Sequence, residues 1–214
     1  MLALCAGMVS GRALEISLFE SALNRDGTVT SPPSDQSSFD FSTGLGTLEY
    51  VLSGAGSHYL GLFLDHGIDE SMNTYFNEFG AATGTLAAGQ SWETDEPGYT
   101  FGNIYDHLEG QTLDNSNGVP NTAPDDVSMA LAWDFVLRLN QTATIGFTVG
   151  ESAPDSGFYL SQTDPDSSAT VYFSSLLDIR DLPPTAVPDA GSTFASLGLA
   201  LAGLAAFRRR QSAT

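Results

Sequence analysis

Apolar and polar residues alternate along this chain in short stretches, and turn-forming residues separate the stretches about every ten positions. Alternation with a period of two puts successive side chains on opposite faces of a β-strand. The stretches are also rich in aromatic and β-branched residues, which favour strands. The pattern predicts strands at residues 14–19, 46–52, 59–64, 75–81, 99–105, 127–139, 142–149, 158–160 and 170–173.

Two of these stretches indicate how the strands are buried. Residues 59–64 are almost continuously apolar, which predicts a strand buried on both faces. Outside the C-terminal tail, no segment keeps a helical period over 12 residues. We therefore predict an all-β ectodomain, an antiparallel β-sandwich with a jelly-roll-like topology. The clearest alternation, within residues 127–139, places on one face Met129, Leu131, Trp133, Phe135, Leu137 and Leu139.

The C-terminal tail differs from the rest of the chain. Residues 194–207 are apolar and uncharged, and Arg208, Arg209 and Arg210 follow them. As a helix this segment would cover roughly 21 Å, which is short of the ~30 Å hydrocarbon core of a bilayer. Its apolar residues lie all round the helix, and a basic cluster at one end is typical of the cytoplasmic side. We predict a short C-terminal transmembrane helix at 194–207 and a basic cytoplasmic tail at 208–214. The alternative is a buried C-terminal helix of the ectodomain.

The N-terminus is also apolar, with small residues at Gly11 and Ala13. This pattern predicts that residues 1–13 are the remnant of a signal peptide, cleaved after Ala13, whose start lies upstream. The alternative is a buried first strand. The ectodomain would then span 14–182, and a linker with a short motif would span 183–193. Cys5, the only cysteine, falls within the presumed signal, which argues against thiol catalysis and a cysteine-based zinc site in the exported domain.

The motif before the apolar segment consists of Val187, Pro188, Asp189, Ala190, Gly191 and Ser192. The order of motif, apolar segment and arginine cluster resembles the PEP-CTERM class of exosortase sorting signals, in the variant that reads Val-Pro-Asp-Ser-Gly. Ala190 replaces the serine of that variant. Residues 113–173 also resemble the β-rich ectodomains that precede such tails, whose activity is undefined.

The resemblance implies an exported protein of a Gram-negative bacterium. Its C-terminal helix would anchor it in the inner membrane during sorting. An exosortase, a membrane-embedded and cysteine-dependent enzyme, would then act near residues 187–192. The resemblance further implies a final place at the cell surface or outside the cell, in association with exopolysaccharide or a biofilm matrix.

The charge of the chain limits its partners. It has 26 acidic residues, seven arginines and no lysine, with a formal net charge of −19, and every acidic residue lies between Glu15 and Asp189. A surface of this sign argues strongly against nucleic-acid binding and disfavours anionic lipids. It favours solubility at a cell surface and raises the question of divalent cations.

One acidic segment has a pattern that suits calcium. Residues 114–118 place oxygen-bearing side chains at alternate positions before a glycine, and two more aspartates follow. Calcium takes six to eight oxygen ligands on flexible loops. The glycine is fifth in the segment, so the pattern is not that of an EF-hand. An Asx-rich turn between strands is the favoured interpretation, and calcium is the alternative. The candidate ligands are Asp114, Ser116, Asp125 and Asp126.

Catalytic patterns are weak. Glu93, Asp95 and Glu96 beside Trp92 could line a sugar site, but an exposed acidic loop with one packed tryptophan is favoured. The sequence contains neither an HExxH pattern nor a GxSxG pattern, and the histidines are interpreted as structural or surface residues. We therefore expect a non-enzymatic surface or matrix protein. One alternative is a carbohydrate-binding module that uses Trp92 and Tyr99, and a less favoured one is a polysaccharide-active enzyme.

Overall fold

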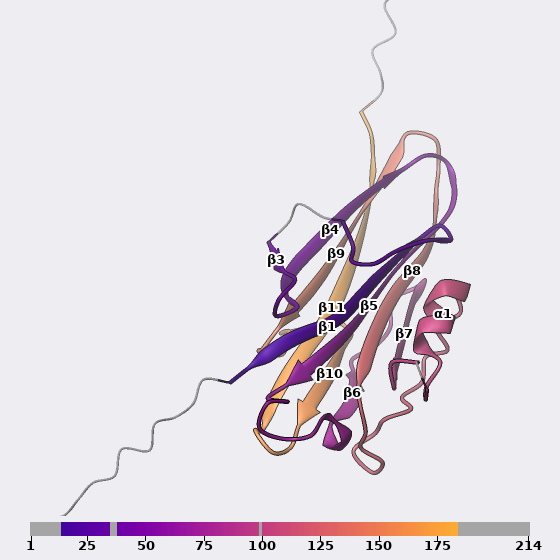
Figure 1. Cartoon of the computed structure of the whole chain (residues 1–214). Coiled ribbons are helices and arrows are strands. Elements are labelled where there is room, and N and C mark those ends of the chain that lie inside the picture. Colours follow the sequence, from indigo (N-terminus) through magenta and orange to yellow (C-terminus); the bar gives the residue numbers. More distant parts are fainter. Residues whose placement is uncertain (1–13, 35–37, 99, 184–214) are drawn as a thin grey trace, which may run out of the picture. The chain divides into compact units, whose positions relative to one another are not determined.

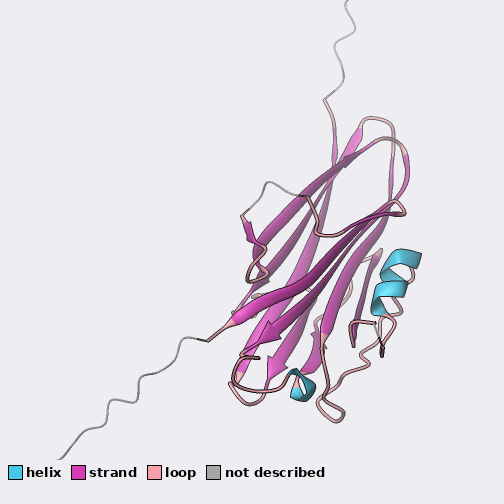
Figure 2. Cartoon of the chain, in the orientation of Figure 1, coloured by secondary structure: helices cyan, strands magenta, loops and turns pink. Residues whose placement is uncertain are grey.

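The computed structural model describes residues 14–34, 38–98 and 100–183, and most of them lie in β-strands (Figures 1 and 2). One antiparallel sheet has the order β2-β1-β5-β8-β7, and the other has the order β3-β4-β9-β11-β10-β6. The prediction of an antiparallel all-β domain is confirmed, and two such sheets are the arrangement of a β-sandwich. The jelly-roll-like topology stays a prediction. The strands are β1 (Ile16–Arg25), β2 (Thr28–Thr30), β3 (Phe39–Asp40), β4 (Leu45–Ser53), β5 (Gly56–Ile68), β6 (Phe79–Thr83), β7 (Gln90–Asp95), β8 (Ser128–Leu137), β9 (Gln141–Gly150), β10 (Tyr159–Asp164) and β11 (Ala169–Asp181).

The main hydrophobic core lies between the sheets and takes side chains from both of them. Strand β8 contributes the predicted alternating residues from Met129 to Leu137, all of which are buried. The prediction for Leu139 is wrong, because that side chain is 82% exposed. The strand ends at Leu137, and the chain turns through Arg138 and Asn140 into β9. In this turn the Gln141 amide donates to the Arg138 carbonyl at 3.2 Å.

A second apolar cluster covers the outer face of the five-stranded sheet, where helix α1 (Ile104–Gly110) packs. Ile104 and Leu108, one helical turn apart, are buried there against Phe63 of β5 and the small Ala130 of β8. Residues 59–68 of β5 are therefore buried on both faces, as the sequence predicted for residues 59–64. The predicted strand at 99–105 is wrong, because α1 begins at Ile104.

Two further strand predictions need correction. Within the predicted strand 75–81, residues Tyr75–Asn77 form a short 3-10 helix, η1, and the strand β6 begins only at Phe79. The Thr74 hydroxyl accepts a hydrogen bond from the Phe76 amide at 3.2 Å, which starts that helix. Of the acidic segment near Trp92, interpreted as an exposed loop, Glu93 and Asp95 belong to strand β7 instead, and Glu96 follows the strand.

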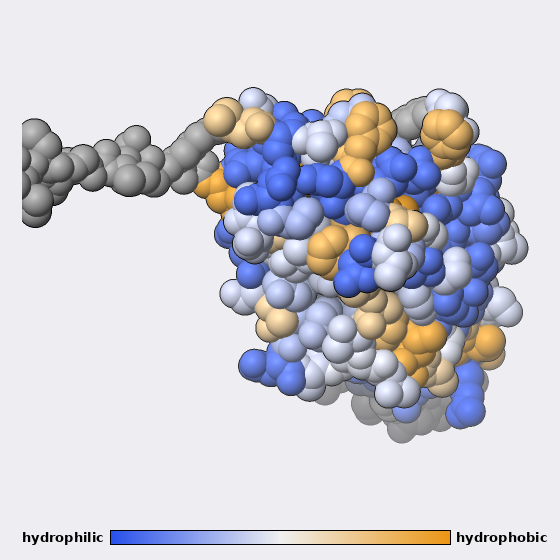
Figure 3. Space-filling view, turned by 90° about the horizontal axis from the view of Figure 1, so that it is seen from below, coloured by the Kyte–Doolittle hydropathy of each residue, from blue (hydrophilic) through white to orange (hydrophobic). Residues whose placement is uncertain are grey.

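The surface carries apolar side chains in separate patches between hydrophilic residues (Figure 3). Phe19 is the most exposed of the described aromatic residues, because the pairing of β1 with β5 shifts register between Leu18 and Glu20. A groove of about 220 Å³ is lined by Phe19, Asp65, Glu70, Tyr75, Pro97 and Asp126.

Backbone contacts divide the chain into two units, Met1–Asp181 and Leu182–Thr214. Within the residues described, no helix is long and apolar enough to cross a membrane. The predicted signal remnant at 1–13, the motif at 187–192, the helix at 194–207 and the tail at 208–214 all lie outside the described residues. These predictions therefore remain open in the structure.

Candidate metal centre

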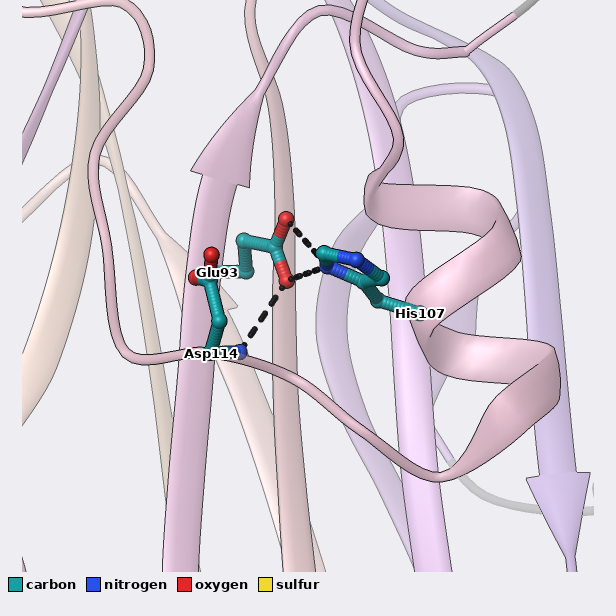
Figure 4. A group of neighbouring side chains, drawn as sticks. All are labelled: Glu93, His107 and Asp114. Atoms are coloured by element: carbon teal, nitrogen blue, oxygen red, sulfur yellow. Dashed lines mark hydrogen bonds and ion pairs between the residues drawn. The ribbon is translucent and has the colours of Figure 1, made fainter.

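Three side chains from three different elements converge beside helix α1 (Figure 4). Glu93 comes from strand β7, His107 from α1, and Asp114 from the loop that follows the helix. One potential ligand atom of each lies within 4.8 Å of the other two. The His107 Nδ1 atom is 2.9 Å from both carboxylate oxygens of Glu93. In addition, the Asp114 amide donates to Glu93 Oε2 at 3.3 Å.

The sheet decides where the Glu93 side chain points. Glu93 pairs with Ala130 of β8, and side chains that pair across two strands lie on the same face of a sheet. Ala130 belongs to the outer cluster beneath α1, so Glu93 also faces the helix. Ile104 and Leu108 fix the helix on the sheet, and this places His107 beside the carboxylate.

The loop that carries Asp114 is held against β7 by backbone and side-chain hydrogen bonds. The Asn115 amide donates to the Trp92 carbonyl at 2.9 Å, and Asn115 Oδ1 accepts from the Trp92 amide at 3.0 Å. Further along, the Gly118 amide donates to the Thr94 carbonyl at 2.7 Å. The loop therefore runs along the free edge of β7 and has a defined position at the site.

Charge and burial act together at this centre. The Glu93 side chain is 1% exposed, and burial raises the pKa of its carboxyl group. Its hydrogen bond to His107 raises the pKa of that imidazole, and the negative charges of Glu93, Asp114 and Asp106 act in the same direction.

Asn103 connects the other side of His107 to the site. The Asn103 side-chain amide forms hydrogen bonds through both its nitrogen and its oxygen in one orientation. In it, Nδ2 donates to Glu93 Oε1 at 3.1 Å and to Asp95 Oδ2 at 3.2 Å. Its Oδ1 then accepts a hydrogen bond from His107 Nε2 at 3.2 Å. The Asn103 backbone amide also donates to Asp95 Oδ2, at 2.9 Å. Asn103 is the N-cap residue of α1 but makes no side-chain cap bond, so its side chain serves the site instead.

The four predicted calcium ligands have different positions. Asp114 is part of the centre, and its Oδ1 accepts from the Ser116 amide at 3.0 Å, which is the Asx turn that the sequence favoured. The Asp125 amide donates to the Glu78 carbonyl at 3.0 Å. Asp126 lines the groove with Asp65 and Glu70. Calcium binding at these four residues stays a prediction.

Sequence patterns missed Glu93 and His107 as partners. Strand β7 has no apolar alternation that would reveal it, and α1 is only seven residues long. The only signal was a histidine flanked by acidic residues, which is common on surfaces. The other two histidines lie away from the centre. His66 is buried, with Nε2 3.2 Å from the Gly44 carbonyl. His58 is partly buried and pairs with the more exposed Asp26 at 3.1 Å.

The comparisons with known proteins concern the tail. No curated protein and no solved structure matches the chain. The family profile described as the VPDSG-CTERM motif matches residues 186–211, which include the motif from Val187 to Ser192, the apolar segment and the three arginines. The match has the order of features that the sequence itself displays. The chain therefore carries a VPDSG-CTERM motif, a PEP-CTERM-type exosortase sorting signal that implies an exported, membrane-anchored precursor.

Proposed function

We propose that this chain is the precursor of a cell-surface or extracellular-matrix protein of a Gram-negative bacterium, whose tail an exosortase removes. The sorting signal at residues 186–211 carries this proposal. The ectodomain acts without catalysis, as an acidic β-sandwich in the exopolysaccharide or biofilm around the cell. The net charge of −19 supports this role, because it keeps a protein soluble and monomeric at a surface.

Cell fractionation with a motif variant tests the proposal. Pro188→Ala lies inside the sorting motif, and Thr185→Ala lies just before it. In the native host, the wild-type chain and Thr185→Ala reach the surface or the medium, whereas Pro188→Ala stays in the inner membrane at its full length. If all three chains distribute equally between the fractions, the motif does not direct sorting and the proposal is wrong.

A second candidate function, binding of a sugar ring, is favoured by the groove near Phe19. Aromatic faces together with hydrogen-bonding carboxyl groups are suited to sugars, and about 220 Å³ accommodates a single ring. The aromatic residues first predicted for this role give less support. Trp92 is partly buried, with its ring 5.7 Å from that of Phe158, and Tyr99 lies outside the described residues.

A titration with the host's own exopolysaccharide tests this candidate. Phe19→Ala removes the exposed ring of the groove, and Phe101→Ala removes a similarly exposed ring that does not line it. Sugar binding in the groove predicts that affinity falls at least tenfold in Phe19→Ala and is unchanged in Phe101→Ala. Equal affinity of the two variants would rule this function out.

A further inference from the structure

The centre combines three potential metal-ligand atoms with a hydrogen-bond partner for the second nitrogen of the histidine ring. With Nε2 directed at Asn103 Oδ1, the His107 ring points Nδ1 at the Glu93 carboxylate, 2.9 Å away. The Asp114 carboxylate reaches the same point. The three atoms lie within 4.8 Å of one another, so one metal ion can contact all of them, whereas a single proton bridges only two.

We propose that Glu93, His107 and Asp114 bind a divalent transition-metal ion of the zinc type, through Nδ1 of the histidine and one oxygen of each carboxylate. The ligand set decides the class of metal. Imidazole nitrogen suits zinc and its neighbours among the transition metals, whereas calcium requires six to eight oxygens. Three protein ligands and one water complete a tetrahedral site.

The geometry needs only a small adjustment. Zinc bonds of about 2.0–2.1 Å hold tetrahedral ligands about 3.4 Å apart. His107 Nδ1 and Glu93 already lie 2.9 Å apart, so the ion would separate them slightly and draw Asp114 inward. Glu93 is buried, while Asp114 is exposed and leaves the centre open to solvent on its side.

A second shell holds these ligands in place. Metal-binding histidines usually donate their other ring N–H to an oxygen, and His107 Nε2 does so to Asn103 Oδ1. The backbone amide of Asp114 donates to Glu93 Oε2, and the side-chain amide of Asn103 donates to Glu93 Oε1. These two bonds orient the Glu93 carboxylate. The ion would join β7, α1 and the loop after α1. It would thus fasten the helix to the sheet in a domain whose described residues contain no cysteine.

Cobalt titration of the full-length chain in detergent tests the proposal, because Co²⁺ in a tetrahedral site absorbs visible light. The titration uses the Cys5→Ser background, since a free thiol would compete as a ligand. His107→Gln and Asp114→Asn each remove one metal ligand, and the side-chain amide introduced at position 114 still accepts from the Ser116 amide. His58→Gln is the matched control, because His58 also pairs with an aspartate, at 3.1 Å, but no third ligand joins them among the residues that the structure describes.

The proposal expects one Co²⁺ per chain, displaced by Zn²⁺, in the parent and in His58→Gln. Affinity falls at least tenfold in His107→Gln and in Asp114→Asn. The exposed position of Asp114 keeps that variant folded, so it decides the outcome if His107→Gln is unstable. Absence of tetrahedral absorption in the parent would overturn the proposal, and so would equal affinity in the parent and Asp114→Asn.

Thermal unfolding gives an independent result. Zn²⁺ raises the Tm of the parent and of His58→Gln, and it leaves the Tm of Asp114→Asn unchanged. An equal rise with Ca²⁺, in the parent and in Asp114→Asn alike, would mean general screening of the acidic surface and would overturn the proposal.

Discussion

Asn24 of β1 donates its side-chain amide to the carbonyl oxygen of Leu108 in α1 at 2.8 Å, across 84 residues of sequence. The same amide donates to the Glu109 carbonyl at 3.0 Å, and Asn24 is fully buried. The last carbonyl groups of a helix lack the usual partner within it. The Asn24 side chain donates to that of Glu109, and to that of Leu108 together with the Gln111 amide, which donates at 3.2 Å. The bond fixes the helix that carries His107.

Asn24→Ala should therefore loosen α1 and lower the free energy of unfolding by about 1–3 kcal/mol, because the carbonyl groups of Leu108 and Glu109 lose the buried side-chain donor that they share. Urea unfolding measures this change. Asn121→Ala, at an exposed position, is the control and should change stability by less than about 0.5 kcal/mol. Equal effects of the two substitutions would contradict the role assigned to Asn24.

Because β8 ends at Leu137, we predict that alanine substitution destabilises the domain at Leu131, within the strand, and not at Leu139, beyond it. Leu131 is fully buried between the sheets, whereas Leu139 is 82% exposed in the turn that follows the strand. Leu131→Ala should cost about 2–5 kcal/mol through lost burial and a cavity, and Leu139→Ala should cost less than about 0.5 kcal/mol. Chemical denaturation of both variants measures the difference. A large cost at Leu139 would mean that the alternation continues beyond Leu137.

Asp65 makes the stability of the domain depend on pH. Burial, and then the nearby charges of Asp126, Glu20 and Glu70, raise its pKa to about 7, while the neighbouring Ser128 hydroxyl acts in the opposite direction. The folded state then binds this proton more tightly than the unfolded chain, whose aspartates titrate near pH 4. Stability is therefore highest below about pH 4 with respect to this group, and it falls as the pH rises to about 7.

Asp65→Asn removes this titration and keeps the size of the side chain. At pH 8 the variant should be more stable than the wild-type chain by about 2–4 kcal/mol, and the difference should vanish near pH 4. Urea unfolding at a series of pH values measures it. Asp155→Asn, at an exposed position, is the control and should follow the wild-type curve. A constant difference at every pH would show that Asp65 does not titrate in this range.

The sequence predicted the fold where local patterns determine the structure. The alternation in β8 and the apolar run in β5 reflect burial on one face and on two faces, respectively. Helix α1 could not be predicted, because seven residues are too few for a helical period, and its position depends on Asn24 and the outer cluster. Strand β7 was missed because tertiary pairing with β8, not its own pattern, makes it a strand.

The sorting signal and the candidate metal centre also differ in how far the sequence alone predicts them. The sorting signal is continuous in sequence, so its order of motif, apolar segment and arginines can be recognised directly. The candidate metal centre combines residues 93, 107 and 114 from three elements, and only folding brings them together. Asp114 was singled out as an oxygen ligand, but its partners in the structure are Glu93 and His107 and not the aspartates that follow it in sequence.

The most direct test of sorting is the intact mass of the protein from the surface fraction of its native host, measured with and without the exosortase. The account predicts a C-terminus between Val187 and Ser192 only when the exosortase is present, and any additional mass would identify a molecule joined to that end. A mass that retains Arg208, Arg209 and Arg210 in both strains would contradict the account.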